Sequence, residues 1–346
     1  MRALAALSLL SCASAPALPA LPELVSDGRY TMGTVLEISL VADAATAQRD
    51  LDAAFARVTE LDALLSRYQP ESDVVRLARL AGRGPQPVDP ATAVALRQAV
   101  EYGRLTGGSF DVTVGPLVEL WTRAADRGVP PTPDEIASAR ERVGADRLRL
   151  GPGHLVALPR AGMSLDLGGF AKGFALDEVA RLLRAGSALL SFGQSSVWAL
   201  GAPPGKPGWR LLMRAPDGSF AGAVTLRDCA FSVSSSFGRS SVIGGRRYGH
   251  VVDPRTGRAL ERSAQASVVA PSAALAEVLS TALLILEPDR GLALVESLPD
   301  VEGMIADAAG TVASSGWEDA THFEPAPVSA RRPLTRVDWH RWGTPP

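Results

Sequence analysis

Helical and strand-like segments follow one another irregularly along this chain of 346 residues, and this order is what most limits its fold. Apolar side chains recur at helical spacing over residues 51–65, whereas residues 35–41 are β-branched and aliphatic, as in a strand. No fixed-period repeat is present. Because the segments do not form a regular strand–helix–strand series, they predict an α+β fold. The length allows one large domain or two closely packed subdomains.

Capping residues and periodicity predict the other elements. Asp89 with Pro90 starts a helix to about Tyr102, and Thr132 with Glu135 starts another to about residue 143. Further helices are predicted over 171–183, 272–286 and 289–297, and strand segments over 148–158, 188–200, 209–213, 223–226, 267–269 and 304–312. A folded domain is therefore expected over residues 26–316, followed by a proline- and arginine-rich tail over 317–346.

The first twenty residues have the pattern of a secretory signal: a basic residue, a short apolar run and then small residues. The run is too short to span a bilayer, which takes about 20 apolar residues. Cys12 follows Leu10 and Ser11, as at a lipoprotein acylation site, whereas simple cleavage between Ala15 and Ala20 would discard it. We expect an exported, periplasmic protein, anchored to the inner membrane if Cys12 is lipidated. Cys229 is the only other cysteine, so no disulfide framework is expected.

The overall charge offers no attraction for polyanions. The net charge is −2 and the isoelectric point is near 6.1. Nucleic-acid binding is therefore not expected, and any phosphate must be bound by local groups.

Residues 164–177 place Asp166 at a predicted strand end, glycines at the turn and Lys172 in the first turn of a helix. Glycines allow a ligand close to the main chain, and a helix start with a lysine favours phosphate. The alternative is a plain strand-to-helix connection, since the spacing matches neither the Rossmann nor the Walker A pattern.

Residues 106–117 form a second glycine-bounded segment, in which Asp111 and Thr113 alternate with Phe110 and Val112. Asp111 could bond a nucleobase or ribose, or it could be a solvated loop carboxylate.

His250 precedes two valines and the Pro-containing turn 253–257. An imidazole titrates near neutrality, so His250 is a candidate to act as a general base or to orient a phosphate. A histidine satisfied within a turn is the alternative.

Glu277 and Thr281 lie four residues apart and share one helix face. A carboxylate beside a hydroxyl suits a hard cation such as magnesium, which often keeps waters and substrate phosphates as further ligands. Alternatively, the glutamate is exposed and the threonine bonds back to the preceding turn.

Taken in order, these segments resemble the ApbE family of FAD:protein FMN transferases over roughly residues 31–315. The matching segments are 32–34, 65–68, 108–117, 165–174, 250–257 and 276–282. The resemblance implies an ApbE-like, T-fold-related architecture of mixed sheets with flanking helices and an FAD site in a cleft between subdomains.

The same resemblance implies the site residues and the reaction. FAD, the substrate, would be held by Met32, Tyr68, Ser109, Phe110, Asp111, Asp166, Lys172 and Val251. Mg2+ would bridge the pyrophosphate, held by the Gly169 carbonyl and by Glu277 and Thr281. Asp166, Lys172 and His250 would take part in catalysis, with His250 moving a proton or positioning the acceptor hydroxyl. A serine or threonine of an acceptor flavoprotein, in some relatives a subunit of a membrane redox complex, would receive FMN as AMP leaves.

Three positions depart from the family pattern. Glu277 stands where family members usually have aspartate, 193–195 is Gly-Gln-Ser in place of Gly-Gly-Asp or Gly-Gly-Asn, and the serines 234–236 replace Thr-Ser-Gly. Two other functions remain open: FAD binding without transfer, and FAD pyrophosphate hydrolysis with water as acceptor.

Overall fold

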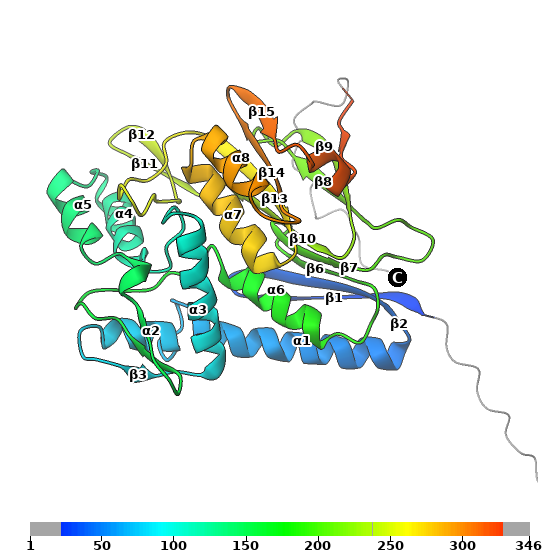
Figure 1. The fold of residues 1–346 in the computed structure, drawn as a ribbon, viewed down its shortest axis with the longest axis horizontal. Coiled ribbons are helices and arrows are strands. Elements are labelled where there is room, and N and C mark those ends of the chain that lie inside the picture. The colour runs from blue at the N-terminus through cyan, green and yellow to red at the C-terminus, as the bar shows by residue number, and fades with distance from the viewer. Residues whose placement is uncertain (1–21, 237, 328–346) are drawn as a thin grey trace, which may run out of the picture.

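A computed structural model describes residues 22–236 and 238–327 (Figure 1). The predicted signal, Cys12 and the last residues of the tail lie outside the described residues. Within the described chain, no helix is both long and apolar enough to cross a membrane.

The centre of the molecule is an eight-stranded sheet whose neighbouring strands all pair antiparallel (Figure 1). In spatial order its strands are β1 (Glu23–Thr31), β2 (Thr34–Ala42), β6 (Ala188–Phe192), β7 (Ser196–Leu200), β10 (Cys229–Ser235), β13 (Ala264–Ala270), β14 (Glu302–Asp307) and β15 (Gly310–Ala313). The predicted α+β class is confirmed.

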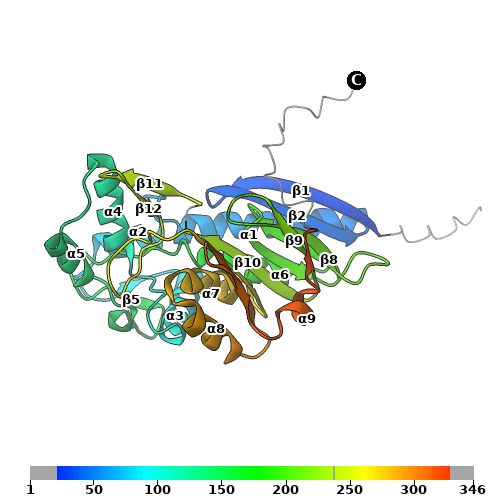
Figure 2. The same ribbon diagram turned by 90° about the horizontal axis from the view of Figure 1, so that it is seen from above.

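Helices cover one face of this sheet and form the main core with it (Figure 2). They are α1 (Ala44–Leu65), α6 (Ala171–Leu182), α7 (Ala273–Ile285) and α8 (Pro288–Glu296). Alternate residues of β2, Leu36, Ile38 and Leu40, are fully buried against this layer. The apolar face formed by alternate residues of β2 thus packs against the apolar face of α1, and both faces are buried from water.

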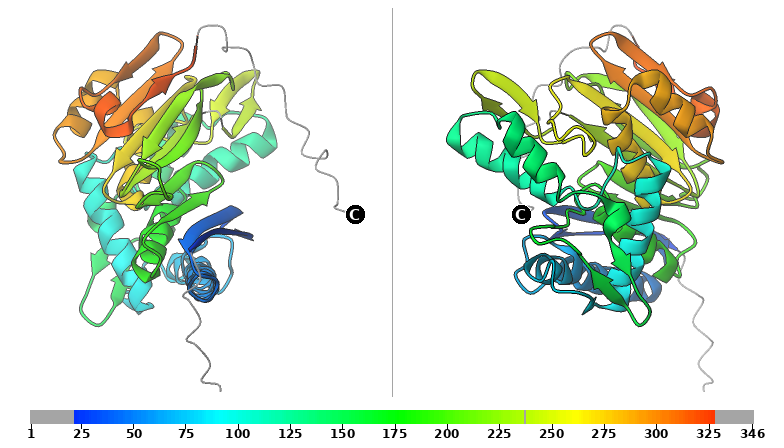
Figure 3. Two further views of the ribbon diagram at one scale, coloured as in Figure 1. Left: turned by 90° about the vertical axis from the view of Figure 1, so that its right-hand side faces the viewer. Right: turned by 60° about the vertical axis from the view of Figure 1, so that its left-hand side comes forward.

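A small second sheet covers part of the opposite face (Figure 3). It consists of β8 (Trp209–Arg214), β9 (Phe220–Leu226) and β16 (Glu324–Pro325), with α9 (Trp317–Thr321) beside it. Val197, Phe231 and Met304 point to it from the central sheet, and Trp317 is only 2% exposed. Residues 317–327, which the sequence assigned to the tail, therefore belong to this packing layer.

The remaining elements lie at the end of the molecule where α4 and α5 are seen in Figure 1. They are α2 (Asp73–Arg79), β3 (Gln86–Pro87), α3 (Pro90–Leu105), α4 (Gly115–Arg127), α5 (Pro133–Arg140), the 3-10 turn Ala145–Arg147, β4 (Arg149–Leu150), β5 (Leu155–Ala157), β11 (Ser240–Ile243) and β12 (Arg246–Gly249). Helices α4 and α5 share a separate apolar cluster with the β11–β12 hairpin.

The predicted caps are confirmed. The Asp89 side chain accepts from the Ala91 N–H at 2.8 Å, Thr132 and Glu135 form a reciprocal capping box, and Ser272 accepts from the Leu275 N–H.

Two strand predictions were wrong, because each segment turns back on itself. Segment 304–312 is the β14–β15 hairpin, in which Asp307 accepts from the Ala309 N–H at 2.8 Å. Segment 188–200 is the β6–β7 hairpin, which reverses through Gly193 and Gln194, both with positive φ.

Candidate functional site

Four segments that the sequence singled out meet at one end of the central sheet. The β1–β2 and β6–β7 turns are in contact, since a side chain at Gly193 would lie 2.5 Å from Thr34 Oγ1. Lys172, at the start of α6, lies 3.3 Å from Ser196 Oγ on β7. The turn before α6 reaches α7, because a Cβ at Gly169 would lie 3.2 Å from Thr281 Oγ1. The structure therefore assembles one candidate site from residues spread along the chain between Thr34 and Thr281.

The centre of this site is an ion pair between Lys172 and Glu277. Glu277 is 3% exposed, and its second carboxylate oxygen accepts from the Gly173 N–H at 2.7 Å. Ser196 Oγ lies 3.4 Å from the other carboxylate oxygen, the one paired with Lys172. The alternative of an exposed glutamate is thus wrong: Glu277 is a buried charge that depends on its partners.

Thr281 and Gly169 stand beside this pair. Thr281 is half-buried and its hydroxyl donates to the Glu277 carbonyl at 3.0 Å, as the back-bonding alternative expected. No group of three or more His, Cys, Asp or Glu in the described ranges could hold a metal. The oxygen atoms of Glu277, Thr281 and Gly169 nevertheless suit a hard divalent cation that keeps phosphate or water ligands. Magnesium binding by these residues stays a prediction, because both carboxylate oxygens of Glu277 already have partners, Lys172 and the Gly173 N–H.

Asp166 is held by donors on both carboxylate oxygens. One oxygen accepts from the Gly168 N–H at 2.8 Å, and the other forms an ion pair with Arg67, which is 99 residues away in the sequence. The Arg67 guanidinium lies 5.3 Å from the centre of the Tyr68 ring. Tyr68 itself is 80% exposed, so its ring is available to a ligand beside Asp166.

The loop carrying Ser109, Phe110 and Asp111 is shaped mainly by its own hydrogen bonds. Ser109 is buried and donates to the Thr106 carbonyl at 2.8 Å. Asp111 accepts from the Thr113 N–H at 2.7 Å and from the Ala145 N–H at 2.9 Å. The Phe110 ring lies near Gly169. The loop therefore contacts the site through Phe110, and a direct role for Ser109 or Asp111 in FAD binding stays a prediction.

Met32 occupies the β1–β2 turn in a left-handed conformation. Its φ is 48°, that of Gly33 is 78°, and Thr31 pairs with Thr34, which is the geometry of a two-residue type I′ hairpin. Left-handed φ is uncommon for a side chain such as methionine. The half-buried Met32 packs at the rim of the main core, beside the β6–β7 turn.

His250 follows β12 and is fixed by the Arg239 carbonyl. Its backbone N–H donates to this oxygen, and its ring Nδ1 lies 3.1 Å from it. A carbonyl can only accept, so Nδ1 carries the proton and Nε2 of the neutral ring is an acceptor. His250 is exposed, yet desolvation of its ring by the surrounding protein lowers its pKa from the ordinary value. The hydrogen bond with Arg239 and the Asp166 charge act in the opposite direction. The next residue, Val251, is half-buried, and its carbonyl accepts from the Leu260 N–H at 3.0 Å.

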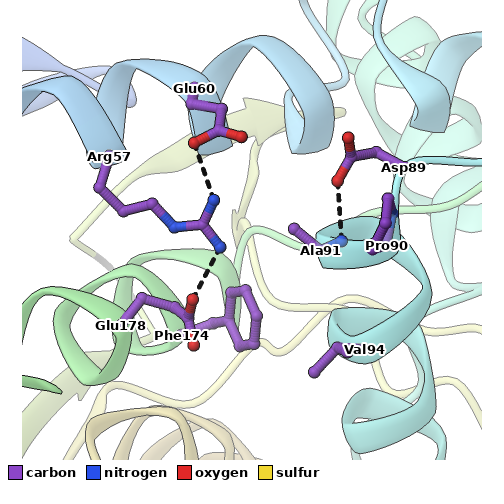
Figure 4. Close-up of a pocket in the computed structure, with 8 residues that line it drawn as sticks. All are labelled: Arg57, Glu60, Asp89, Pro90, Ala91, Val94, Phe174 and Glu178. Atoms are coloured by element: carbon purple, nitrogen blue, oxygen red, sulfur yellow. Dashed lines mark hydrogen bonds and ion pairs between the residues drawn. The ribbon is translucent and has the colours of Figure 1, made fainter. Parts of the chain in front are cut away.

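A separate pocket of about 420 Å3 lies between α1, α3 and α6 (Figure 4). Its one arginine, Arg57, is ion-paired with Glu60 at 2.8 Å and with Glu178 at 2.7 Å. None of the predicted site residues lines this pocket. Arg57 is fully engaged there, and the remaining carboxylate of the pocket, Asp89, caps α3. We therefore take the Lys172–Glu277 site as the candidate for the chemistry.

The sequence model of the ApbE family matches residues 32–305, which include every residue of this site. The chain belongs to the ApbE family.

Its relatives in that family have a common activity in their names. FAD:protein FMN transferase of Treponema pallidum is 30% identical over 302 residues, covering 81% of this chain and 83% of that protein. The protein of the same name from Salmonella typhimurium is 31% identical over 294 residues, covering 77% of this chain and 79% of the relative. The apo crystal structure of Pseudomonas stutzeri flavinyl transferase ApbE matches with a TM-score of 0.75 at 26% identity, covering 87% of this chain and 98% of the other.

The departures from the ApbE pattern lie within the same site. The longer side chain at Glu277 reaches both Lys172 and the first turn of α6. Gln194 has a φ of 63°, a conformation easier for the glycine that it replaces.

The third departure, the serine-rich end of β10, leads to residues that the sequence did not identify. Ser280, next to Thr281 on α7, is within hydrogen-bond distance of Ser232 Oγ at 3.0 Å and Ser234 Oγ at 2.8 Å. Arg67 and Ser196 were likewise missed as site residues. Arg67 lay inside a matched family segment, but nothing in the sequence identified Asp166 as its partner.

Proposed function

We propose that this chain is a magnesium-dependent FAD:protein FMN transferase, which moves FMN from FAD to a threonine or serine hydroxyl of an acceptor flavoprotein and releases AMP. The observation that carries the proposal is the meeting of Lys172, Glu277, Gly169 and Thr281 at the start of α6, in a chain of the ApbE family. These groups suit a pyrophosphate with its cation.

FAD would lie across the turn of Met32, the exposed Tyr68 ring and the loop around Phe110. An exposed aromatic face can stack on a planar ring system. Lys172 and the start of α6 would hold the phosphates, because the N-cap residue Phe170 supplies no side-chain hydrogen bond and a helix start favours anions. Asp166, fixed by Arg67 and Gly168, and the backbone at Val251 would complete the binding surface.

Magnesium held by Glu277, Thr281 and the Gly169 carbonyl would neutralise charge on the pyrophosphate. The acceptor hydroxyl oxygen forms a bond to the FMN phosphorus, and the bond from that phosphorus to the AMP oxygen breaks. His250 Nε2 takes the hydroxyl proton, since Nδ1 is already committed to the Arg239 carbonyl. Lys172 stabilises the charge on the transferring phosphoryl group.

The predicted location and partner belong to the same proposal. The export signal over residues 1–20 would carry the chain to the periplasm, and a lipid on Cys12 would hold it at the inner membrane. The acceptor would then be an exported flavoprotein, such as a subunit of a membrane redox complex.

The test is AMP release from FAD by the mature protein, with magnesium and then with a chelator. We expect release only with magnesium, a loss of at least a hundredfold in Thr281→Ala, and substantial retention in Thr281→Ser, which keeps the hydroxyl. Tight FAD binding without AMP release would identify a binding protein. Release that is equal in Thr281→Ala and the unmodified protein would refute the cation site.

A further inference from the structure

The residues around His250 form the most strongly basic stretch of an otherwise nearly neutral chain. Residues 239–258 contain five arginines and a single acidic residue, giving a formal charge of +4, whereas the whole chain carries −2. The five arginines, all exposed, are Arg239, Arg246, Arg247, Arg255 and Arg258. The acidic residue, Asp253, is buried and ion-paired with Arg255 at 3.0 Å. This excess of charge is displayed at the surface.

Half of the basic stretch forms a hairpin that packs against helix α4. Strands β11 and β12 reverse through Gly244 and Gly245, both left-handed, in a two-residue hairpin beside α4 (Figures 1 and 2). Ile243 and Tyr248 are buried against α4, where the Tyr248 ring lies 4.9 Å from that of Trp121. One face of the hairpin is therefore packed against α4, and the other faces solvent.

The outer face of the hairpin combines charge with an apolar group. Val242 pairs directly with Arg247, so both side chains lie on the same face, and Val242 is 70% exposed. Arg247 Nε donates to Ser240 Oγ at 2.8 Å on this face. Such a face suits a polypeptide with carboxylates and an apolar side chain better than a small free anion.

Helices α4 and α5 beside the hairpin carry four acidic and three basic side chains, so their formal charge of −1 offsets only part of the +4. Helices α4 and α5 carry both signs, and their Glu119 and Glu135 are ion-paired with Arg123 and Arg127. The acidic groups of these pairs are thus matched within the two helices.

The hairpin is also joined to the candidate catalytic residue, because the Arg239 carbonyl just before β11 holds the His250 ring. We propose that the β11–β12 hairpin docks an acidic, extended segment of the acceptor polypeptide and so brings its hydroxyl to His250. The inference rests on the proposed function for the role of His250. An acceptor must approach Nε2, and the adjoining basic surface selects acidic sequence around the modified residue.

The test is fluorescence anisotropy with FAD present, using a labelled peptide that has aspartates on both sides of one threonine. A matched peptide has asparagine at every aspartate. We expect the aspartate peptide to bind more tightly, and Arg246→Glu with Arg247→Glu to weaken its binding by about tenfold or more. High salt should abolish the difference between the peptides. Arg83→Glu with Arg184→Glu is the matched control, since both arginines are exposed and lie on other elements; its peptide affinity should stay within about twofold.

Three results would overturn the proposal, provided that circular dichroism shows the variants folded. Arg246→Glu with Arg247→Glu could leave the peptide affinity unchanged. FAD affinity could fall together with peptide affinity, which would assign the arginines to the dinucleotide. Binding to phosphatidylglycerol vesicles could be lost while peptide binding persists, which would assign them to a membrane surface. AMP release measured on the same preparations separates failure of the transferase proposal from failure of the docking surface.

Discussion

Lys172 and Glu277 are the two residues on which the candidate site depends most. Glu277 is almost fully buried, so its charge is tolerable only with the ammonium of Lys172, the Gly173 N–H and Ser196 around it. The chain has only one other lysine, Lys206, which is exposed. This difference in burial provides a matched test.

Lys172→Met is expected to lower the free energy of unfolding by about 2 kcal/mol, because it leaves Glu277 buried without its cation. This loss of stability is smaller than is usual for a broken buried ion pair, since Lys172 is itself partly exposed. Urea unfolding measures it, with Lys206→Met expected to stay within about 0.5 kcal/mol of the unmodified protein. Equal stability of the two variants would mean that Glu277 does not need Lys172.

His250 gives the reaction a predicted pH dependence. Its pKa lies below 6.5, so the ring stays neutral, and able to accept a proton, to a lower pH than an ordinary histidine. Transfer should therefore be constant through neutrality and fall as the pH drops through that lowered pKa. The pH profile of kcat/KM for the acceptor checks this, and His250→Ala should remove the acid limb. An acid limb centred above 6.5, or one that persists in His250→Ala, would contradict the assignment.

At the level of elements, the site requires α6 and α7 to lie unusually close together. A Cβ at Gly173 would lie 2.3 Å from the Ala273 carbonyl oxygen, so only glycine allows this approach and the hydrogen bond from Gly173 to Glu277.

Gly173→Ala should force α6 and α7 apart and lower the free energy of unfolding by about 2 kcal/mol or more. Gly186→Ala is the control, because a Cβ there meets nothing within 4 Å. Thermal unfolding should show a lower Tm for Gly173→Ala alone. Unchanged stability in both variants would show that the helices can separate without loss.

The sequence predicted the elements whose signals are local. Helices α3, α5 and α7 begin with capping residues, and α1 and α6 have clear helical spacing. Strand β1 was missed because its mixed composition, including Asp27 and Gly28, has no regular alternation. Strand β10 was missed because it contains several serines, and the hydrogen-bond partner of Ser232 and Ser234 is Ser280, 48 and 46 residues further along.

The candidate site, too, could be predicted only where its signals are local in the sequence. Family motifs identified the residues that meet at the start of α6. The pairs Arg67–Asp166 and Lys172–Glu277, however, each join residues about 100 positions apart. No local sequence pattern encodes such contacts.

At the scale of the whole molecule, the central sheet is stabilised from both sides. The main core lies under the helices, and the second sheet covers the other face with Trp317 fully inside it. The indole N–H of Trp317 is buried without a hydrogen-bond partner among the described residues, so packing is its main contribution.

Trp317→Ala should therefore lower the free energy of unfolding by about 3–5 kcal/mol, whereas Trp317→Phe, which keeps an aromatic ring, should lose clearly less. Chemical denaturation monitored by far-UV circular dichroism separates the two. A loss below about 1 kcal/mol for the alanine variant would place Trp317 outside the cooperative core.

We propose above all that the assembled site transfers FMN to a protein. The most direct test of this proposal is to incubate the mature protein with FAD, magnesium and a flavin-acceptor protein, and to measure AMP and the mass of the acceptor together. We expect equal molar amounts of AMP and of acceptor carrying covalent FMN, and neither product with Thr281→Ala. AMP accompanied by free FMN and an unmodified acceptor would contradict the proposal and identify a pyrophosphatase.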